Sequence, residues 1–309
     1  QFERVRPRTL VMIIVGSIAG YVLISQLAQV DLIGLLRSAN WWWLAIALVL
    51  SAVTFVAAAW SLSGFVPERL PLHRTVMAQL AGSFATLVSP PTIGSIAINV
   101  RFLMKSGVHP ALAGASVGVS QVLAFVFHIL LLTGFGIAAG TRSDHTFDPP
   151  RWAVIGVIVV VLLALGLLAV PAVRRQIVKR VGPLLKEVIP RLVTVAQRPV
   201  KLVEGIGGIL LLNLAFIGVL YACVEAFGGS LNIAVVAVVY LAGATLGQAA
   251  PTPGGLGAVE AALAAGLTAG GLDAGLAVSA VLAFRLITFW LPTVPGYWAF
   301  NWLTRNNAL

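Results

Sequence analysis

Residues 251–260, Pro-Thr-Pro-Gly-Gly-Leu-Gly-Ala-Val-Glu, have the most distinctive residue types and spacing in the chain. The two prolines remove backbone donors, and the three glycines permit turns and close backbone approach. A helix that begins after Gly257 would present free N–H groups, with a partial positive charge, to the protein interior. Such a helix end can bind the phosphate of a lipid headgroup; a structural hinge without a ligand is the alternative. A nucleotide loop is excluded, because no Gly-Lys-Ser/Thr follows and no strand precedes.

Glu260 and Arg285 are the charged residues placed deepest in apolar sequence. A charge inside a membrane is costly unless it is paired or hydrated, so both residues are functional candidates by default. One interpretation is that they pair and clamp residues 251–260 to the last apolar segment. The other is that they contact a lipid headgroup directly. We expect Arg285 to supply positive charge to a phosphate and Glu260 to hold Arg285 in place.

A second Pro/Gly break, Ser-Pro-Pro-Thr-Ile-Gly-Ser, occupies residues 89–95 and precedes Arg101 and Lys105. The Arg101 guanidinium can bind a phosphate through two N–H groups at once, which the Lys105 ammonium cannot do. Anchoring of these cations at the cytoplasmic interface is an equally good interpretation. The candidate headgroup-binding residues of the two breaks are Thr92, Gly94, Ser95, Asn99, Arg101, Lys105, Thr252, Gly254, Gly255, Gly257, Glu260 and Arg285.

The other polar residues predict neither a catalytic nor a metal site. Gln121, His128 and Gln248 lie inside apolar segments, where helix-packing hydrogen bonds are more common than ligand contacts. The histidines are scattered and Cys223 is the only cysteine, so we expect no internal disulfide, no metal and no other cofactor. No His–carboxylate constellation points to an enzyme.

The composition predicts an all-α polytopic membrane protein. The chain is 59% hydrophobic and only 10% charged, whereas soluble domains carry roughly 25% charged residues. This excludes a soluble globular enzyme, and the continuously apolar runs exclude a transmembrane barrel, whose strands alternate. The net charge of +10 fits the positive-inside rule and anionic lipid headgroups at the cytoplasmic leaflet, rather than nucleic acid.

Apolar runs of about 20 residues can cross a bilayer, and they divide the chain into spans of a single transmembrane domain, residues 1–309. Two further segments, 76–105 and 233–269, are hairpins broken by the Pro/Gly stretches. Residues 172–204 are amphipathic and basic, which is typical of a segment on the cytoplasmic leaflet. The six predicted full spans are about 10–30, 41–65, 111–139, 152–170, 205–227 and 274–303.

Short sequences recur in the same order in both halves, which indicates an internal repeat. Leu-Ala-Gly at 80–82 returns at 241–243, and Val-Leu-Ala-Phe at 122–125 returns at 281–284. A Pro/Gly break follows the first of these sequences in each half. The predicted repeats cover about 41–140 and 205–303.

The basic residues indicate how these repeats cross the membrane. If residues 76–105 enter and leave by one face, the basic chain start and segment 172–204 are both cytoplasmic, as the positive-inside rule requires. A full crossing would place them on opposite sides. The charges therefore favour re-entrant hairpins, inverted repeats and cytoplasmic termini; two ordinary Pro-kinked helices are the alternative. Inverted repeats with discontinuous helices are typical of transporters.

The chain resembles the lysylphosphatidylglycerol synthase transmembrane region over nearly its whole length. The residues that carry the resemblance are Pro-Thr-Pro-Gly-Gly-Leu-Gly at 251–257 with Glu260, Phe-Arg-Leu at 284–286 and Trp-Leu-Pro at 290–292. The stretch at 89–94 with Arg101 is similar to the family's first Pro/Gly element, although Ser95 stands where a carboxylate is expected. The resemblance implies lipid translocation: bifunctional members flip aminoacylated phosphatidylglycerol made by a soluble synthase domain. Other members are associated with lipid-linked sugars.

We therefore expect a multi-pass flippase of the cell membrane that moves a phosphate-bearing phospholipid or a lipid-linked sugar between leaflets. Membrane segments account for the 309 residues, so no synthase domain is expected within them. The sequence also contains no ATP-binding motif. Movement would be passive or coupled to an ion or proton gradient. The alternatives are a membrane anchor or scaffold for a fused or partner soluble domain, and a lipid-modifying enzyme. The start at Gln1, without a signal peptide, indicates a segment of a longer protein.

Overall fold

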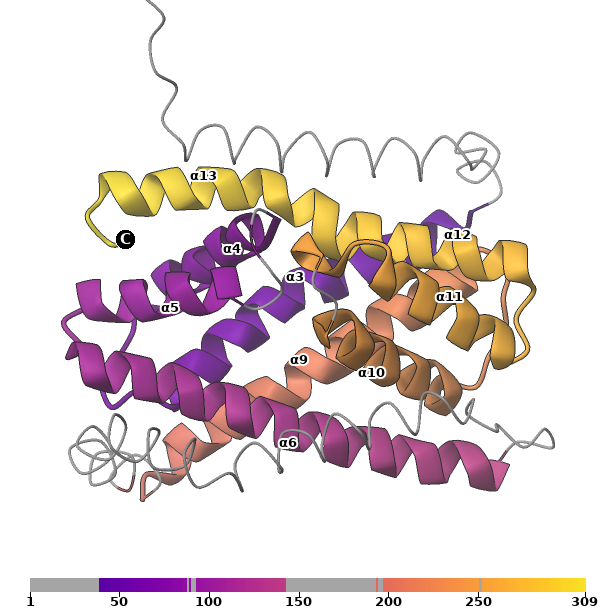
Figure 1. Ribbon diagram of the computed structural model, residues 1–309, viewed down its shortest axis with the longest axis horizontal. Helices are drawn as coiled ribbons and strands as arrows, with labels where there is room; N and C mark the ends of the chain where they lie inside the picture. Colours follow the sequence, from indigo (N-terminus) through magenta and orange to yellow (C-terminus); the bar gives the residue numbers. More distant parts are fainter. Residues whose placement is uncertain (1–38, 88, 90–92, 143–192, 194–196, 250–251) are drawn as a thin grey trace, which may run out of the picture.

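The computed structural model describes residues 39–87, 89, 93–142, 193, 197–249 and 252–309, and this part of the chain is helical with no strand (Figure 1). The predicted spans 10–30 and 152–170 lie outside the described residues. So does most of the predicted basic segment 172–204.

Four helical segments in the described part are long and apolar enough to cross a membrane, which makes this a multi-pass membrane protein. They are α3 (Trp41–Gly64), α6 (Pro110–Arg142), α9 (Pro199–Ala226) and a continuous final segment. The last consists of α12 (Ala274–Arg285), a π-helical turn (Leu286–Trp290) and α13 (Leu291–Arg305). Even the 24 residues of α3 reach roughly 36 Å at about 1.5 Å per residue, more than the ~30 Å hydrocarbon core.

The described spans agree with the four predicted from the sequence at 41–65, 111–139, 205–227 and 274–303. The largest difference is at α9, which begins at Pro199 rather than near residue 205. Proline is favoured in the first helical turn because its missing N–H is not needed there. The last residues of the predicted segment 172–204 therefore belong to this helix.

Both Pro/Gly stretches separate pairs of shorter helices. α4 (Leu72–Leu87) packs against α5 (Ile93–Lys105), and α10 (Ile233–Ala249) packs against α11 (Ala258–Ala269) after the 3-10 turn η1 (Pro253–Gly255). The chain thus turns back at each break. In Figure 1 the α4–α5 pair occupies one half of the bundle and the α10–α11 pair the other, while the long helices extend through both.

The helix contacts of the two halves correspond to one another. α4 packs against α13 and α5 against α6; in the other half α10 packs against α6 and α11 against α12. α3 and α9, the first helices of the two halves, form the most extensive contact with each other. Each hairpin therefore lies against the last long helix of both halves.

Small residues allow α3 and α9 to approach closely. A Cβ atom on Gly208 would lie 2.4 Å from the Ser61 nitrogen and 2.8 Å from the Ala57 oxygen, and one on Gly64 would meet the Gly205 backbone. Such sites are typical of membrane helix interfaces, where backbones touch without intervening side chains. Gly207, one residue away, has nothing within 4 Å of its Cβ position.

The π-helical turn in the last span has a partner on α3. Pro292 and Pro295 follow this turn and lack the N–H that a regular helix would use. Ser51 Oγ donates to the Ile287 carbonyl at 3.1 Å. On α4, Ser83 Oγ donates to the Pro292 carbonyl at 3.3 Å. The irregular part of the last span is thus held by hydrogen bonds from both α3 and α4.

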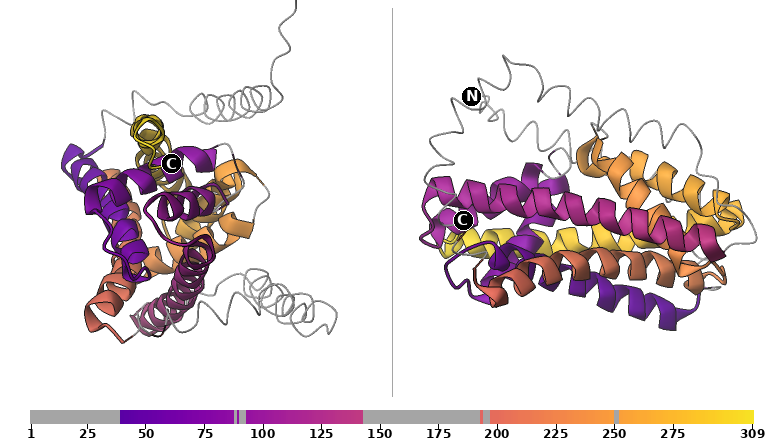
Figure 2. Two further views of the ribbon diagram at one scale, coloured as in Figure 1. Left: turned by 90° about the vertical axis from the view of Figure 1, so that its left-hand side faces the viewer. Right: turned by 90° about the horizontal axis from the view of Figure 1, so that it is seen from below.

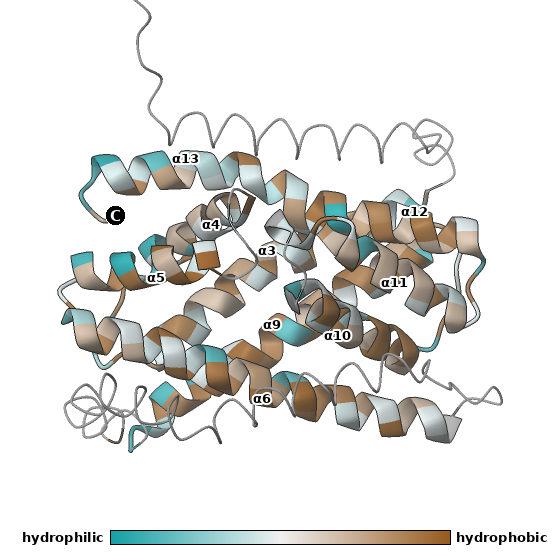
Figure 3. Ribbon diagram, viewed as in Figure 1, coloured by the Kyte–Doolittle hydropathy of each residue, from teal (hydrophilic) through white to brown (hydrophobic). Residues whose placement is uncertain are grey.

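The surface of the bundle is apolar along the long helices. α6 lies at the periphery (Figure 2) and exposes a row of large apolar side chains: Val122, Phe125, Val126, Leu130 and Ile137. Hydropathy is high along the long helices, and polar residues gather near the ends (Figure 3). A large apolar surface of this kind suits contact with lipid tails.

The basic residues of the described part gather at one end of the bundle. This end holds the starts of α4, α6 and α9 and the ends of α5 and α13 (Figure 1). Arg142 closes α6 at the opposite end, and Arg285 lies inside the last span. The basic residues at or near the first end are Arg69, Arg74, Arg101, Lys105, Arg198, Lys201 and Arg305.

Candidate headgroup site at the Pro/Gly breaks

Glu260 and Arg285 form a buried ion pair. Arg285 Nε donates to Glu260 Oε1 at 2.7 Å, and Arg285 Nη2 donates to the Gly254 carbonyl at 3.1 Å. The guanidinium carbon lies 4.3 Å from the centroid of the Phe289 ring, a favourable cation–π position. Only 9% of Glu260 and 7% of Arg285 is exposed. The predicted clamp between the second break and the last span is therefore confirmed.

The second oxygen of Glu260 binds the start of its own helix. The Gly257 N–H donates to Glu260 Oε2 at 2.8 Å, which is the side-chain half of a capping box. One N–H of this helix end is thus occupied by the protein's own carboxylate and is not free for an anion. The carboxylate neutralises both the Arg285 guanidinium and part of the helix dipole.

The glycines of this break adopt backbone conformations that other residues rarely take. Gly254, Gly255 and Gly257 have φ angles of 59°, 67° and 83°. A Cβ on Gly254 would also lie 2.3 Å from Phe289 Cζ. Thr252 Oγ1 donates to the Leu256 carbonyl at 3.0 Å and so closes the turn. The Pro/Gly composition therefore builds a tight turn whose Gly254 carbonyl accepts from Arg285.

At the first break the predicted residues pack α5 against α4. A Cβ on Gly94 would lie 2.7 Å from the Ala85 oxygen, and one on Gly82 would lie 3.3 Å from Ser95 Cβ. Asn99 is buried, and its Oδ1 accepts from Gln79 Nε2 at 3.0 Å. Thr92 lies outside the described residues.

The second break lies against the first hairpin, because α4, the helix that precedes the first break, contacts the η1 turn. Arg101 and Lys105 are exposed and lie farther along α5. At about 1.5 Å per residue they are roughly 12 Å and 18 Å from the helix start. The structure therefore brings Gly254, Glu260 and Arg285 together, whereas Arg101 and Lys105 belong to the basic end of the bundle.

The family profile described as the lysylphosphatidylglycerol synthase TM region matches residues 9–296. The chain belongs to this family. The match includes both Pro/Gly breaks and the Glu260–Arg285 pair, so the resemblance expected from the sequence is confirmed. No individual curated protein matches the chain.

A hydrogen-bonded histidine joins three helices of this family member beside a cavity of about 440 Å³. His128 Nδ1 on α6 lies 3.0 Å from Asn213 Oδ1 on α9, and its Nε2 lies 2.9 Å from the Leu241 oxygen on α10. The predicted helix-packing role of His128 is confirmed. A neutral imidazole can donate to only one of these oxygens, whereas an imidazolium can donate to both.

The sequence interpretation named His128 but missed its partners. Asn213 Nδ2 donates to the Ile209 carbonyl at 2.9 Å, which orients its Oδ1 towards the histidine. Thr245 Oγ1 lies 3.1 Å from His128 Nε2. The sequence signal that could have identified Asn213 and Thr245 is that each is a polar residue inside an apolar segment. Gln121 and Gln248 line the same cavity.

Proposed function

We propose that this protein is a lipid flippase that moves a phosphate-bearing phospholipid or lipid-linked sugar between the leaflets of the cell membrane. The observation that carries the proposal is the buried Glu260–Arg285 pair at the second Pro/Gly break, where that break contacts α4 of the first hairpin, in a member of this family. A pure anchor or scaffold would have no use for such a charge pair, because intramembrane charges are costly.

An inverted repeat is the architecture we infer for this transporter. It is supported by the placement of the two hairpins in opposite halves of the bundle (Figure 1) and by the matching helix contacts. The equivalent glycines of the recurring Leu-Ala-Gly sequences, Gly82 and Gly243, both face the second helix of their hairpin. Hairpins that meet from opposite sides are typical of transporters with alternating access.

The basic end of the bundle is the cytoplasmic end in this proposal. The C-terminus lies there together with all the basic residues of the described part except Arg142 and Arg285. This distribution is what the positive-inside rule requires. The N-terminal residues lie outside the described part, and their arginines predict the same side.

Arg285 is the residue we assign to the lipid phosphate. Its bonds to Glu260 and Gly254 use two of the five N–H donors of a guanidinium. The remaining donors can bind a phosphate while the carboxylate keeps the group in place. Residues of the two breaks shape the passage, and Arg101 and Lys105 attract anionic headgroups at the leaflet surface.

Reconstitution into liposomes tests the proposal. A fluorescent phospholipid is placed in both leaflets, and a membrane-impermeant quencher reports how fast the inner pool reaches the outer leaflet. We expect the wild type to move the lipid and Arg285→Ala to slow it by at least about tenfold, the effect of losing one charge-assisted phosphate contact. Arg305→Ala, which removes an exposed cation at the chain end, is the matched control and should keep the wild-type rate.

One further variant keeps this test decisive if Arg285→Ala fails to fold. Arg285→Lys preserves the charge beside Glu260 but loses the fork of donors, so we expect it to fold and to move the lipid slowly. Wild-type rates in well-folded Arg285→Ala and Arg285→Lys would refute the site assignment, and absence of movement in the wild type would refute the function.

A further inference from the structure

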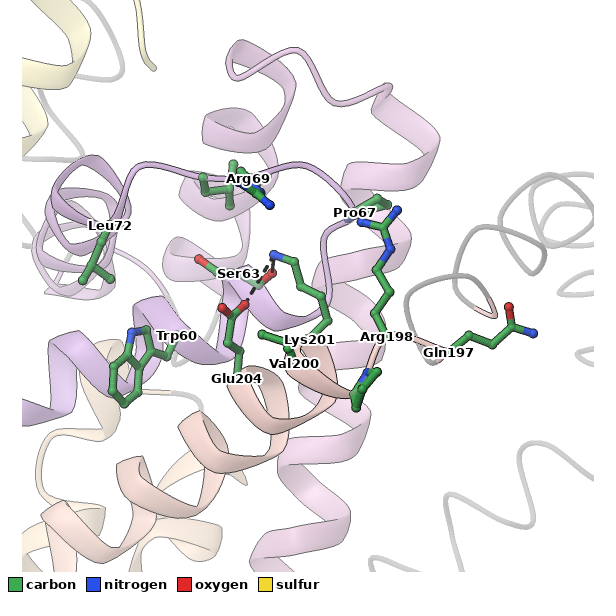
Figure 4. A pocket seen from close by; sticks show the side chains of 12 residues that line it. Trp60, Ser63, Pro67, Arg69, Leu72, Gln197, Arg198, Val200, Lys201 and Glu204 are labelled. Carbon is green, nitrogen blue, oxygen red and sulfur yellow. Dashed lines mark hydrogen bonds and ion pairs between the residues drawn. The ribbon is translucent and has the colours of Figure 1, made fainter.

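A second cavity, away from the Pro/Gly breaks and lined in part by charged residues, lies at the basic end of the bundle where α3 ends and α9 begins (Figure 4). Its volume is about 640 Å³. Side chains from the last turns of α3, the connection to α4 and the first turn of α9 line it. They include the side chains of Trp60, Ser63, Arg69, Arg198, Lys201 and Glu204.

The charge in this cavity is predominantly positive. Three cations, Arg69, Arg198 and Lys201, surround a single acid, Glu204. Lys201 Nζ donates to the Ser63 carbonyl at 2.8 Å and lies 3.4 Å from Glu204 Oε2. Within the described part of the chain, neither arginine side chain has a hydrogen bond or ion pair. The cavity therefore carries two uncompensated positive charges.

The start of α9 adds to the attraction for an anion. Arg198 is the N-cap residue and makes no side-chain capping hydrogen bond, and Pro199 follows it. The N–H groups of the next residues have no intrahelical acceptor, as in the first turn of any helix. The positive end of the helix dipole therefore points into a cavity that already holds cations.

An apolar groove continues from the cavity along α9. The adjoining space, of about 540 Å³, shares Trp60 and Val200 with the cavity and adds Val203 and Gly207. Positions 200, 203 and 207 lie on one helix face, and 68% of Val200 and 72% of Val203 is exposed. Tryptophan is enriched at membrane interfaces. A cationic cavity at the end of the span thus opens into an apolar groove that runs along it.

We propose that this cavity and its groove bind an anionic phospholipid from the leaflet at the basic end of the bundle. The phosphate would lie among Arg69, Arg198 and Lys201, and an acyl chain would lie along Trp60, Val200 and Val203. The combination excludes a free anion as the best occupant, because an anion would leave the groove empty. The site is separate from the Glu260–Arg285 pair, and binding to it is measured without any transport step.

Lipid binding to the detergent-solubilised full chain tests this proposal by native mass spectrometry. The probes are phosphatidic acid and phosphatidylcholine with identical acyl chains. We expect the wild type to retain phosphatidic acid preferentially, and Arg198→Gln to weaken its binding about fivefold, the effect of one cation near a membrane surface. Arg198→Gln/Lys201→Gln should weaken it by roughly 25-fold on the same basis. Arg305→Gln, at the same end but outside the cavity, should bind like the wild type.

Two further experiments distinguish binding of the acyl chain in the groove from binding of the headgroup in the cavity. Val203→Ser should weaken phosphatidic acid binding, because it places a hydroxyl in the apolar groove, and leave folding intact because Val203 is exposed. Inorganic phosphate at millimolar concentration should compete poorly with the lipid. Wild-type affinity in Arg198→Gln, or equal loss in Arg305→Gln, would overturn the cationic site. Full competition by inorganic phosphate would overturn the lipid as its occupant.

Discussion

The ion pair between Glu260 and Arg285 joins α11 and α12 at the end opposite to their covalent connection. Residues 270–273 link the two helices on one side, and the 2.7 Å contact between Arg285 Nε and Glu260 Oε1 links them on the other. The same guanidinium holds the Gly254 carbonyl. The second break is therefore fixed to the last span through one side chain.

Removing one partner of this pair should destabilise the protein strongly. Glu260→Ala leaves Arg285 buried without a counter-charge, a change that typically costs about 3–5 kcal/mol. Glu260→Gln retains the acceptor for the Gly257 N–H and should lose less. Thermal unfolding in detergent measures both. The double variant Glu260→Gln/Arg285→Met should lose less stability than the sum of the losses in the single variants Glu260→Gln and Arg285→Met. Strictly additive losses would contradict an energetic coupling between the two side chains.

Gly254→Ala should disturb the second break for two reasons. A side chain at φ 59° is strained, and its Cβ would approach Phe289 Cζ to 2.3 Å. We expect a loss of at least about 1–3 kcal/mol from the backbone alone. Gly257→Ala is the matched control, because its φ of 83° is strained but nothing lies within 4 Å of its Cβ position. Phe289→Leu in the Gly254→Ala background should restore part of the difference; equal losses in the two glycine variants would argue against the contact.

The α3–α9 interface predicts opposite effects at adjacent glycines. Gly208→Ala forces the helices apart, because its Cβ meets the Ser61 backbone, and overpacking typically costs about 1–3 kcal/mol. Gly207→Ala has open space and should be neutral or stabilising by up to about 1 kcal/mol, the difference in helix propensity. Melting temperatures of the two variants check this. Equal melting temperatures of the two variants would contradict the close approach of α3 and α9 at Gly208.

His128→Leu should weaken the junction of α6, α9 and α10. The change leaves Asn213 Oδ1 without its histidine partner, and an unsatisfied buried polar group typically costs about 1–3 kcal/mol. Gln121→Leu, on the same helix and lining the same cavity, should change stability by less than about 0.5 kcal/mol. Unfolding of both variants in detergent provides the comparison, and an equal effect of the two would contradict a specific role for the histidine.

Labelling of single cysteines with a membrane-impermeant reagent tests the topology. The native Cys223 is buried and is replaced by serine in these variants. We expect Ser106→Cys and Asn306→Cys to be labelled from the same side of the membrane, and Ser230→Cys from the other. The reason is that α5 and α13 end where α9 begins, and α9 ends at the opposite face. Labelling of Ser106→Cys and Ser230→Cys from one side would exclude the inverted arrangement.

Much of the fold could be predicted because its signals are local. Continuous apolar runs predicted the four described spans, and the Pro/Gly stretches predicted the broken hairpins. The pairing of Glu260 with Arg285 was one of two interpretations, and it followed from the cost of isolated charges in apolar sequence. None of these features depends on which helices contact one another.

What could not be predicted depends on contacts between distant segments. Arg101 follows a Pro/Gly break as Glu260 does, yet the direction of α5 carries it to the basic end of the bundle. Asn99 bonds to Gln79 rather than remaining free, because Gly82 and Gly94 bring α4 and α5 together. The partners of His128 lie on two other helices, and no spacing in the sequence indicates their proximity.

The π-helical turn at Leu286–Trp290 sets the rotational register between the two halves of the last span. A π turn is equivalent to one residue added to a regular α-helix, and each residue turns an α-helix by about 100°. Deleting one residue here would turn the α13 face that contacts α4 out of alignment while Arg285 stayed beside Glu260. A single residue in an apolar segment thus couples the orientation of the Glu260–Arg285 pair to the packing of α13 against α4 of the other hairpin.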